Sequence, residues 1–270
     1  MMKKTLSVIM LTGAIGLGVG SSAQAVGSFP YDGLNNYNYN QATNYMNSVG
    51  QSTMSKANVK DYEAIGRVSN LNGWKGAGKD SMGTGFVIDN HTFVTNQHVV
   101  ETKDGKIADP RHIKMTMQHD NDKHKYTFNA NSIHKINGAD LVVINTRQDM
   151  SKYVEPLNLA NEKSIDSIRT GDTLRSVGYD KYSPNGTSDN NKQMWRSDGF
   201  ALMKTSNDKE LMMKSIFRSG GSGSPLMNAH GDVVGIMAYG YNLDGLQNSE
   251  LSGGFTFDGE TRNQIEKYMK

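Results

Sequence analysis

The fold is decided by the stretch Gly83-Thr-Gly-Phe-Val-Ile-Asp-Asn-His-Thr-Phe-Val-Thr-Asn-Gln-His-Val-Val100. It holds two short apolar runs, and a histidine follows the second run closely. Short apolar runs separated by Gly, Asn, Asp and Lys recur along the chain, at residues 113–117, 141–144, 174–177, 211–217 and 233–237. Such runs between turn residues are typical of all-β sandwiches and barrels. The sequence therefore predicts an all-β domain, which we place at residues 58–270.

Only the end of the chain has a helical pattern. Between Glu260 and Lys270, the apolar residues Ile265, Tyr268 and Met269 fall on one face of a helix. The turn residues 258–259 precede it. We therefore expect a C-terminal α-helix after the last strand.

The first 25 residues have the layout of a secretory signal peptide. A basic start, residues 1–4, is followed by an apolar run over residues 5–20 and by Ala23-Gln24-Ala25, which suits a signal peptidase. The run is shorter than the roughly 20 residues of a membrane span. Residues 1–25 are therefore predicted to be a signal peptide, and the protein is expected to be secreted and free of the membrane after cleavage.

Residues 26–57 differ in composition from the rest of the chain. Asn and Tyr dominate between Tyr31 and Tyr45, aliphatic residues are few, and no helical or strand period is present. A segment of this kind buries little apolar surface. We interpret it as a pro-segment or a flexible N-terminal arm, and an ordered N-terminal extension is the alternative.

Charge and cysteine content exclude several classes of function. The net charge of +2 includes Lys3 and Lys4, so the chain without its signal peptide has 27 basic and 27 acidic residues. No basic block stands out, which argues against a nucleic-acid partner. The chain contains no cysteine, which excludes disulfides, thiol nucleophiles and thiolate zinc sites. We expect a monomer without a cofactor.

Three segments carry residues suited to acyl transfer. They are Thr95-Asn-Gln-His98-Val-Val100, Gly138-Ala-Asp140-Leu-Val-Val-Ile144 and Ser219-Gly-Gly-Ser222-Gly-Ser-Pro225. A serine hydroxyl needs an imidazole to remove its proton, and a buried carboxylate orients that imidazole. We therefore predict Ser222 as nucleophile, His98 as general base and Asp140 as the residue that orients the base.

The glycines around Ser222 predict an oxyanion hole. Backbone N–H groups can converge on a developing oxyanion only where side chains do not hinder the approach. Gly220 and Ser222 are predicted to donate these N–H groups. A flexible linker has a similar composition, but an apolar strand starts soon afterwards at Val233. The glycines therefore lie inside a domain.

From Tyr62 to Lys270 the chain resembles the glutamyl endopeptidase and exfoliative toxin family of bacterial chymotrypsin-like serine proteases. The resemblance rests on the three segments above, on the Gly-x-Gly-Phe-Val-Ile strand at 83–88, on the Val-Val-Gly-Ile strand near Gly235 and on the terminal helix. It implies a secreted endopeptidase without cysteine that acts on protein or peptide substrates. It also implies two antiparallel Greek-key β-barrels of six strands each, with the triad at their interface.

One departure from this family concerns the substrate. The glutamate-specific members have a histidine on the strand after Gly-Ile and a threonine five residues before the nucleophile. Here these positions hold Met237 and Phe217, which cannot donate to a carboxylate. Tyr239, on the same strand, is expected to narrow the pocket. The pocket therefore predicts apolar P1 residues. Glutamate specificity is the alternative, with Arg218 as a possible donor.

Other enzyme classes fit less well. An α/β-hydrolase needs Gly-x-Ser-x-Gly and the order Ser, Asp, His, and neither is present. The sequence of residues 73–79 is similar to that of a phosphate-binding loop, but Asp80 stands where a magnesium-binding hydroxyl is required. His112, His119 and His124 do not have the spacing of a helical metal-binding pair, so no metal site is predicted. The remaining alternative is a secreted binding protein that has kept the protease fold.

Overall fold

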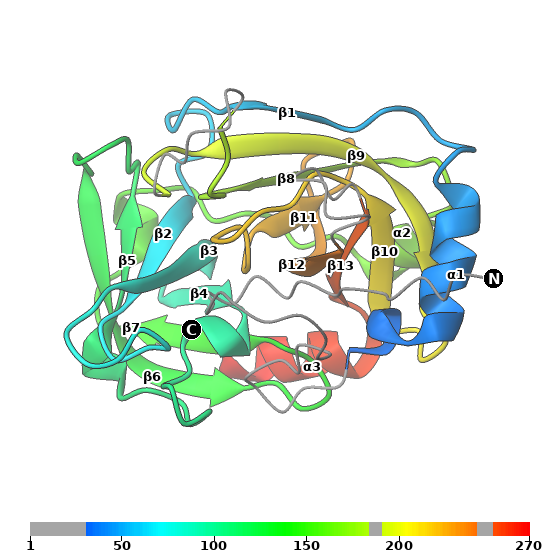
Figure 1. Cartoon of the computed structure of the whole chain (residues 1–270). Helices are drawn as coiled ribbons and strands as arrows, with labels where there is room; N and C mark the ends of the chain where they lie inside the picture. Colours follow the sequence, from blue (N-terminus) through cyan, green and yellow to red (C-terminus); the bar gives the residue numbers. More distant parts are fainter. Residues whose placement is uncertain (1–30, 184–190, 242–250) are drawn as a thin grey trace.

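The computed structural model describes residues 31–183, 191–241 and 251–270, which form two adjacent β-barrels (Figure 1). The predicted signal peptide and residues 26–30 lie outside the described residues. The first barrel is closed, with its antiparallel strands in the order β2-β3-β4-β7-β6-β5. These strands are β2 (Ile65–Asn70), β3 (Ser81–Asp89), β4 (Thr92–Thr95), β5 (Ile113–Met117), β6 (Tyr126–Lys135) and β7 (Val142–Thr146).

The second barrel belongs to a seven-stranded antiparallel sheet with the order β1-β9-β10-β13-β12-β11-β8. Because β8 also pairs with β9, the six strands from β8 to β13 close on themselves, and β1 lies outside along β9. The strands are β1 (Thr53–Lys56), β8 (Thr173–Gly178), β9 (Trp195–Lys204), β10 (Glu210–Lys214), β11 (Pro225–Met227), β12 (Val233–Tyr241) and β13 (Leu251–Thr256). The predicted fold of two antiparallel barrels is confirmed.

Helices are few in the described residues, and they lie at the ends of the chain or between strands. The α-helices are α1 (Asn36–Tyr45), α2 (Glu162–Asp166) and α3 (Gly259–Tyr268), and the short 3₁₀ helices are η1 (Asp32–Leu34), η2 (Gln97–Val99), η3 (Pro110–His112) and η4 (Met150–Lys152). α3 confirms the predicted C-terminal helix. Its Ile265 is fully buried, and the Tyr268 ring stacks on His134 with centroids 4.2 Å apart.

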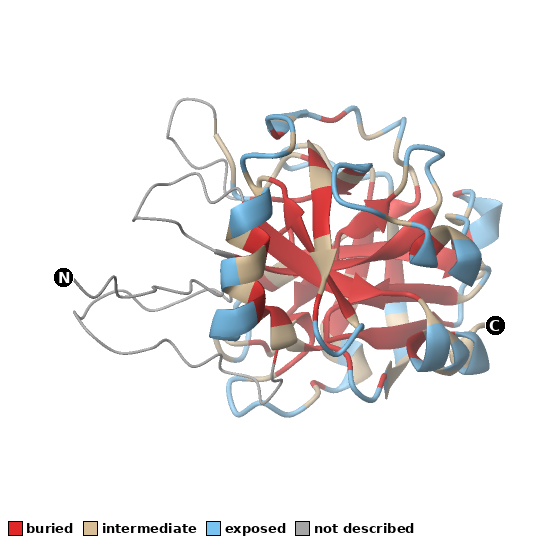
Figure 2. Cartoon of the chain, turned by 90° about the vertical axis from the view of Figure 1, so that its right-hand side faces the viewer, coloured by how far each residue is buried: buried red, intermediate tan, exposed pale blue. Residues whose placement is uncertain are grey.

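The two cores share strands of the first barrel. Val142 and Ile144 of β7 face the core inside the first barrel, whereas Val143 belongs to the core that continues into the second barrel. Successive side chains of a strand point to opposite faces, so β7 is buried on both sides. This explains its uninterrupted apolar run. Figure 2 shows the strands as the buried centre, with exposed residues on helices and loops.

The N-terminal residues 31–57 correct the expectation of a segment without regular structure. They contain η1, α1 and β1, and Tyr31 and Asn38 are buried. Polar contacts replace the missing aliphatic packing. The Asn38 side-chain amide donates to Asp32 O over 3.0 Å, and its Oδ1 accepts from Ser206 N over 3.2 Å and from Ser206 Oγ over 2.9 Å. Aliphatic content alone therefore underestimated the order of this segment. Whether it is cleaved on maturation stays a prediction.

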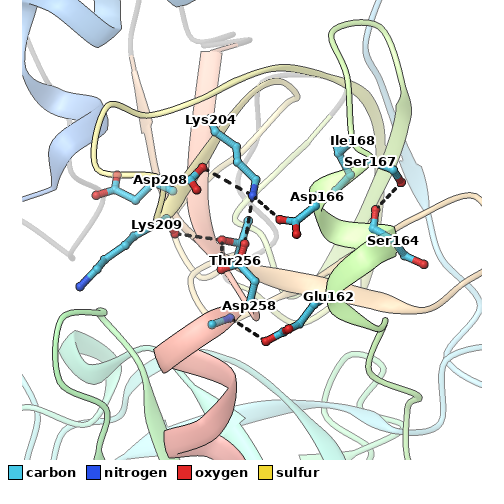
Figure 3. Close-up of polar contacts among 12 residues, drawn as sticks. Glu162, Ser164, Asp166, Ser167, Ile168, Lys204, Asp208, Lys209, Thr256 and Asp258 are labelled. Carbon is cyan, nitrogen blue, oxygen red and sulfur yellow. Dashed lines mark hydrogen bonds and ion pairs between the residues drawn. The ribbon is translucent and has the colours of Figure 1, made fainter.

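An ion cluster joins α2, the end of β9 and the start of α3 (Figure 3). Lys204 Nζ lies 3.0 Å from Asp258, 3.2 Å from Asp166 and 3.6 Å from Asp208, measured to carboxylate oxygens. Burial lowers the pKa of Lys204, but the hydrogen bond and charge of Asp258, with smaller contributions from Asp166 and Asp208, raise it above its usual value. The cluster thus links α2, β9 and α3 on this side of the second barrel.

Candidate active site

Two neighbouring strands of the first barrel bring His98 and Asp140 together. β4 and β7 pair antiparallel, with Thr95 opposite Val142. The end of β4 therefore lies beside the start of β7. His98 lies in η2, just after β4, and Asp140 lies just before β7. Strand register thus joins two residues that are 42 positions apart in the sequence.

His98 and Asp140 are joined by two hydrogen bonds. Nδ1 of His98 lies 2.5 Å from Oδ2 of Asp140, and the His98 backbone N–H donates to Oδ1 over 3.0 Å. Asp140 is 1% exposed. Asn96 fixes its backbone, because the Asn96 side-chain amide donates to the Asp140 carbonyl over 2.7 Å. A proton held on Nδ1 leaves Nε2, on the far side of the ring, as the proton acceptor.

Each residue of this pair favours the charged form of the other. Burial raises the pKa of Asp140, but the charge of His98 and hydrogen bonds from His98 and Tyr31 bring it below its usual value. Burial lowers the pKa of His98, but Asp140 and, more weakly, Glu101 raise it above its usual value. An ionised Asp140 therefore stabilises the imidazolium that forms when His98 accepts a proton.

Ser222 lies in the loop between β10 and β11 of the second barrel, and glycines shape this loop. Gly220 and Gly223 have φ angles of +93° and +90°, a region that favours glycine. Any Cβ at Gly223 would collide with the carbonyl oxygen of Thr84 in β3. The loop therefore bends tightly against the first barrel, and Ser222 is 4% exposed.

The segments that carry His98 and Ser222 meet at Gly83. A Cβ at Gly83 would lie 2.6 Å from Val99 Cγ2, next to His98, and 3.0 Å from the Ser222 carbonyl oxygen. In the part of the chain that the structure describes, Ser222 Oγ makes no hydrogen bond to His98. Contacts of this kind often tighten only when substrate binds.

Thr84 attaches the Ser222 loop to the first barrel. Its backbone N–H donates to Ser222 O over 2.8 Å, and its hydroxyl donates to Gly220 O, also over 2.8 Å. The Thr95 hydroxyl in turn donates to Thr84 O over 2.6 Å. The position of the Ser222 loop thus depends on β3, the neighbour of β4, which precedes His98.

Two further side chains support the loop from the second barrel. Asp180 Oδ1 accepts from Arg218 N over 2.8 Å, and Asn191 donates from its side-chain amide to Ser219 O over 2.7 Å. A Cβ at Gly221 would collide with the Asp180 carboxylate. The glycine at this position therefore allows the carboxylate to lie directly against the loop.

The N–H groups predicted for the oxyanion hole have no hydrogen-bond acceptor in the part of the chain that the structure describes. Within the described residues, neither Gly220 N nor Ser222 N donates a hydrogen bond, whereas Gly221 N and Gly223 N donate to carbonyls over 2.9 and 3.0 Å. Buried N–H groups normally have partners. Two such groups on the nucleophile loop suit the stabilisation of an oxyanion.

The three predicted pocket residues are buried. Phe217, Met237 and Tyr239 are each 2% exposed or less. The Tyr239 hydroxyl donates to Glu210 Oε2 over 2.6 Å, so the tip of this side chain is held by an interior carboxylate. The Phe217 ring lies against Gly240, where a Cβ would be 2.9 Å from Phe217 Cδ1. Contact of these residues with a substrate stays a prediction.

Sequence reasoning missed four residues at this site, namely Thr84, Asp180, Asn191 and Tyr31. The last of these donates from its hydroxyl to Asp140 Oδ2 over 2.7 Å. Of the four, only Thr84 lies in a segment on which the family resemblance rested. The other three come from a segment interpreted as removable and from the chain around residues 180–191, where no motif marks them.

Other features of the described residues add no second site. No group of three His, Asp or Glu side chains in these residues is arranged to hold a metal ion. The rings of His119 and His124 stack with centroids 6.2 Å apart, and burial, aided by Arg67, lowers the pKa of His119 to about 4. Among the same residues no helix is both long and apolar enough to cross a membrane.

Residues 83–236 match the family described as "Trypsin-like peptidase domain". A Glu endopeptidase solved in complex with MPD has a TM-score of 0.62 and 18% identity, over 81% of this chain and 97% of that one. The protease Anisep from Arthrobacter nicotinovorans has a TM-score of 0.62 and 17% identity, over 80% and 98%.

The VesB protease of Vibrio cholerae has a TM-score of 0.60 and 13% identity, over 80% of this chain and 67% of that chain. At these identities the solved structures show a shared fold. Together with the family match, they confirm the resemblance to chymotrypsin-like bacterial proteases of the glutamyl endopeptidase kind.

Proposed function

Because this chain belongs to the trypsin-like peptidase family, we propose that it is a serine endopeptidase that cleaves protein or peptide substrates. Ser222 is the nucleophile, His98 the general base and Asp140 the residue that orients the base. The observation that carries the proposal is the contact of 2.5 Å between His98 Nδ1 and a buried Asp140 carboxylate. A structural histidine does not need a buried counter-charge of this kind.

The reaction follows from these positions. Ser222 Oγ attacks the scissile carbonyl carbon as His98 Nε2 takes the hydroxyl proton, and the oxyanion accepts hydrogen bonds from Gly220 N and Ser222 N. His98 then gives the proton to the leaving amine as the C–N bond breaks, which leaves an acyl-enzyme. Water attacks this ester with His98 as base again. The acid product leaves and Ser222 regains its proton.

Hydrolysis and covalent labelling of Ser222→Ala test this proposal. The wild type should hydrolyse casein and bind a fluorophosphonate at Ser222, and the variant should lose about 10⁴-fold or more of the activity and all of the labelling. The thermal transition of the variant should remain. A wild-type protein that neither cleaves nor labels would favour the alternative, a binding protein with the protease fold.

For the substrate, we propose a preference for apolar P1 residues over Glu and Asp. Met237 and Phe217 offer apolar surface, and a buried substrate carboxylate without donors is costly. Arg218, the cation that follows Phe217 directly in the sequence, donates to Phe217 O over 2.8 Å. Its guanidinium lies 6.0 Å from the centroid of the Tyr182 ring. Peptides that differ only at P1 test this preference, and dominance of Glu would contradict it.

We further propose that the enzyme is secreted as a monomer, after removal of residues 1–25. The support is the basic, apolar and small-residue order of that segment. Expression with and without these residues in a secreting host tests secretion. Size-exclusion chromatography of the medium then tests the monomeric state. Accumulation of the full chain inside the cells would contradict the first.

A further inference from the structure

A tyrosine from the N-terminal segment touches the residue that orients the base. The Tyr31 hydroxyl donates over 2.7 Å to Asp140 Oδ2, which is also the oxygen that binds His98 Nδ1. Tyr31 is 7% exposed, and 109 positions separate it from Asp140. One carboxylate oxygen thus accepts hydrogen bonds from both the imidazole and a phenol.

The backbone next to Tyr31 is held by a buried carboxylate of β10. Glu210 is fully buried and accepts from Asp32 N over 2.7 Å and from Gly33 N over 3.1 Å. It also accepts from the Tyr239 hydroxyl over 2.6 Å. Burial raises the pKa of Glu210, and these three donors oppose that rise. The site is therefore built around residues 31–33.

The fit is close as well as polar. The Tyr31 ring lies edge-on to Tyr239 with centroids 5.0 Å apart, and 6.0 Å from the Phe255 ring. A Cβ at Gly33 would collide with the Tyr239 hydroxyl, so the segment can lie here only with glycine at that position. A further anchor follows, because Asn207 N donates to Asp32 Oδ2 over 2.9 Å.

We propose that Tyr31 is a positioning residue of the active site, which holds the Asp140 carboxylate, and that residues 31–34 therefore belong to the mature enzyme. This inference rests on the proposed function. A carboxylate that accepts from a phenol and from an imidazole at one oxygen has one preferred orientation. Since Asp140 determines the direction of the His98 ring, Tyr31 acts through Asp140 on His98.

The charges around Tyr31 keep it a donor. Its pKa is raised well above its ordinary value by burial first, and then by Asp140, Glu210 and Glu101. A protonated phenol reduces the negative charge that Asp140 presents to His98. Loss of the hydroxyl should therefore raise the pKa of His98, which Asp140 and Glu101 already raise against the effect of burial.

Tyr31→Phe tests the proposal, with Tyr179→Phe as a matched control. Tyr179 is a buried tyrosine as well, and its hydroxyl accepts one hydrogen bond, from His119 N over 3.2 Å. We expect Tyr31→Phe to lower kcat about tenfold with little change in KM, since a hydrogen bond to a charged group is lost. The acid limb of kcat/KM should move to higher pH. The control should alter only the thermal transition.

A second readout does not need turnover. The downfield proton resonance of His98 Nδ1–H reports its hydrogen bond to Asp140, and it should move in Tyr31→Phe but not in Tyr179→Phe. An unchanged resonance together with an unchanged pH profile in a folded Tyr31→Phe overturns the proposal. If the wild type shows the resonance but no hydrolysis, the proposed function fails; a shift of the resonance in Tyr31→Phe then still supports the positioning of Asp140 by Tyr31, and an unchanged resonance overturns it.

The mature N-terminus gives a test that does not depend on any variant. N-terminal sequencing of the secreted, active protein should find a chain that starts at or before Tyr31. A fully active form that starts after Leu34 would overturn the assignment of residues 31–34 to the enzyme, whatever the stability of Tyr31→Phe.

Discussion

The two barrels position their parts of the candidate site in different ways. The first barrel presents His98 and Asp140 at the ends of β4 and β7, two strands paired in register. The second barrel presents Ser222 on a loop with two glycines of positive φ, and hydrogen bonds from outside the loop hold it. Geometry set by strand register is difficult to disturb without unfolding, whereas geometry set by loop contacts can be changed in steps.

The largest effect should come from the chemistry of the first barrel. Asp140→Asn should keep the fold and lower kcat by about 10⁴-fold, because the amide no longer holds the productive His98 tautomer. Steady-state kinetics beside a thermal melt measures the two quantities separately. A loss of only a few fold would show that another group orients the histidine.

A smaller loss should follow when the loop of the second barrel is loosened. Thr84→Val removes the hydroxyl that donates to Gly220 O over 2.8 Å. The Gly220 N–H should then be less well placed for the oxyanion. Since complete loss of such a donor costs about 10²–10³-fold in kcat, we expect a decrease of about tenfold.

Two variants control for this change. Thr84→Ser keeps the hydroxyl and should keep most of the activity. Thr116→Val removes a similar hydroxyl bond, to Arg67 O over 3.3 Å in the first barrel, and should leave kcat unchanged. Equal losses in Thr84→Val and Thr116→Val would show that the loop does not depend on this contact.

The pH dependence reports on the first barrel in finer detail. Because Asp140 and Glu101 raise the pKa of His98 against the effect of burial, the acid limb of kcat/KM should lie above the ordinary histidine value of 6.5. Glu101→Gln should move it toward lower pH. A limb below 6.5 in the wild type would mean that burial dominates.

The same shift has the opposite sign for stability. The folded protein holds the His98 proton more tightly than the unfolded chain does. The resulting stabilisation is complete below the unfolded pKa and is lost as pH rises through the folded one. Activity should therefore increase over the pH range in which this stabilisation decreases.

The smallest effect should come from the ion cluster of the second barrel. Lys204→Met removes three ion pairs of a partly exposed side chain, so solvent screening keeps the expected loss of unfolding free energy at about 1 kcal/mol or less. Lys60→Met, at an exposed position with no ion pair in the described residues, should leave the free energy of unfolding unchanged. Reduced kcat in Lys204→Met would link the cluster to the site.

Local pattern predicted much of the fold and of the candidate site. The strands and α3 follow from apolar periodicity, and Ser222 with its glycines follows from short-range spacing. These features depend on neighbours in the sequence.

The N-terminal segment could not be predicted in the same way. Asn38 is buried because its amide oxygen accepts a hydrogen bond from Ser206, and Tyr31 is buried because Asp140 accepts a hydrogen bond from its hydroxyl. Both contacts join distant parts of the chain through polar atoms. Hydrophobic periodicity carries no information about such pairs, so a polar composition was interpreted as a lack of order.

The last turn of the chain couples the two barrels mechanically. α3 follows β13 of the second barrel, yet Tyr268 O accepts from Asn145 in β7 over 2.8 Å. Lys270 O accepts from His91 N over 2.8 Å, and Lys270 N donates to Thr92 Oγ1 over 3.0 Å. Separation of the barrels would break these three hydrogen bonds. Heating should therefore give one calorimetric peak with equal calorimetric and van't Hoff enthalpies. If the chain is cut between β7 and β8, each fragment loses the hydrogen bonds between the end of the chain and the first barrel.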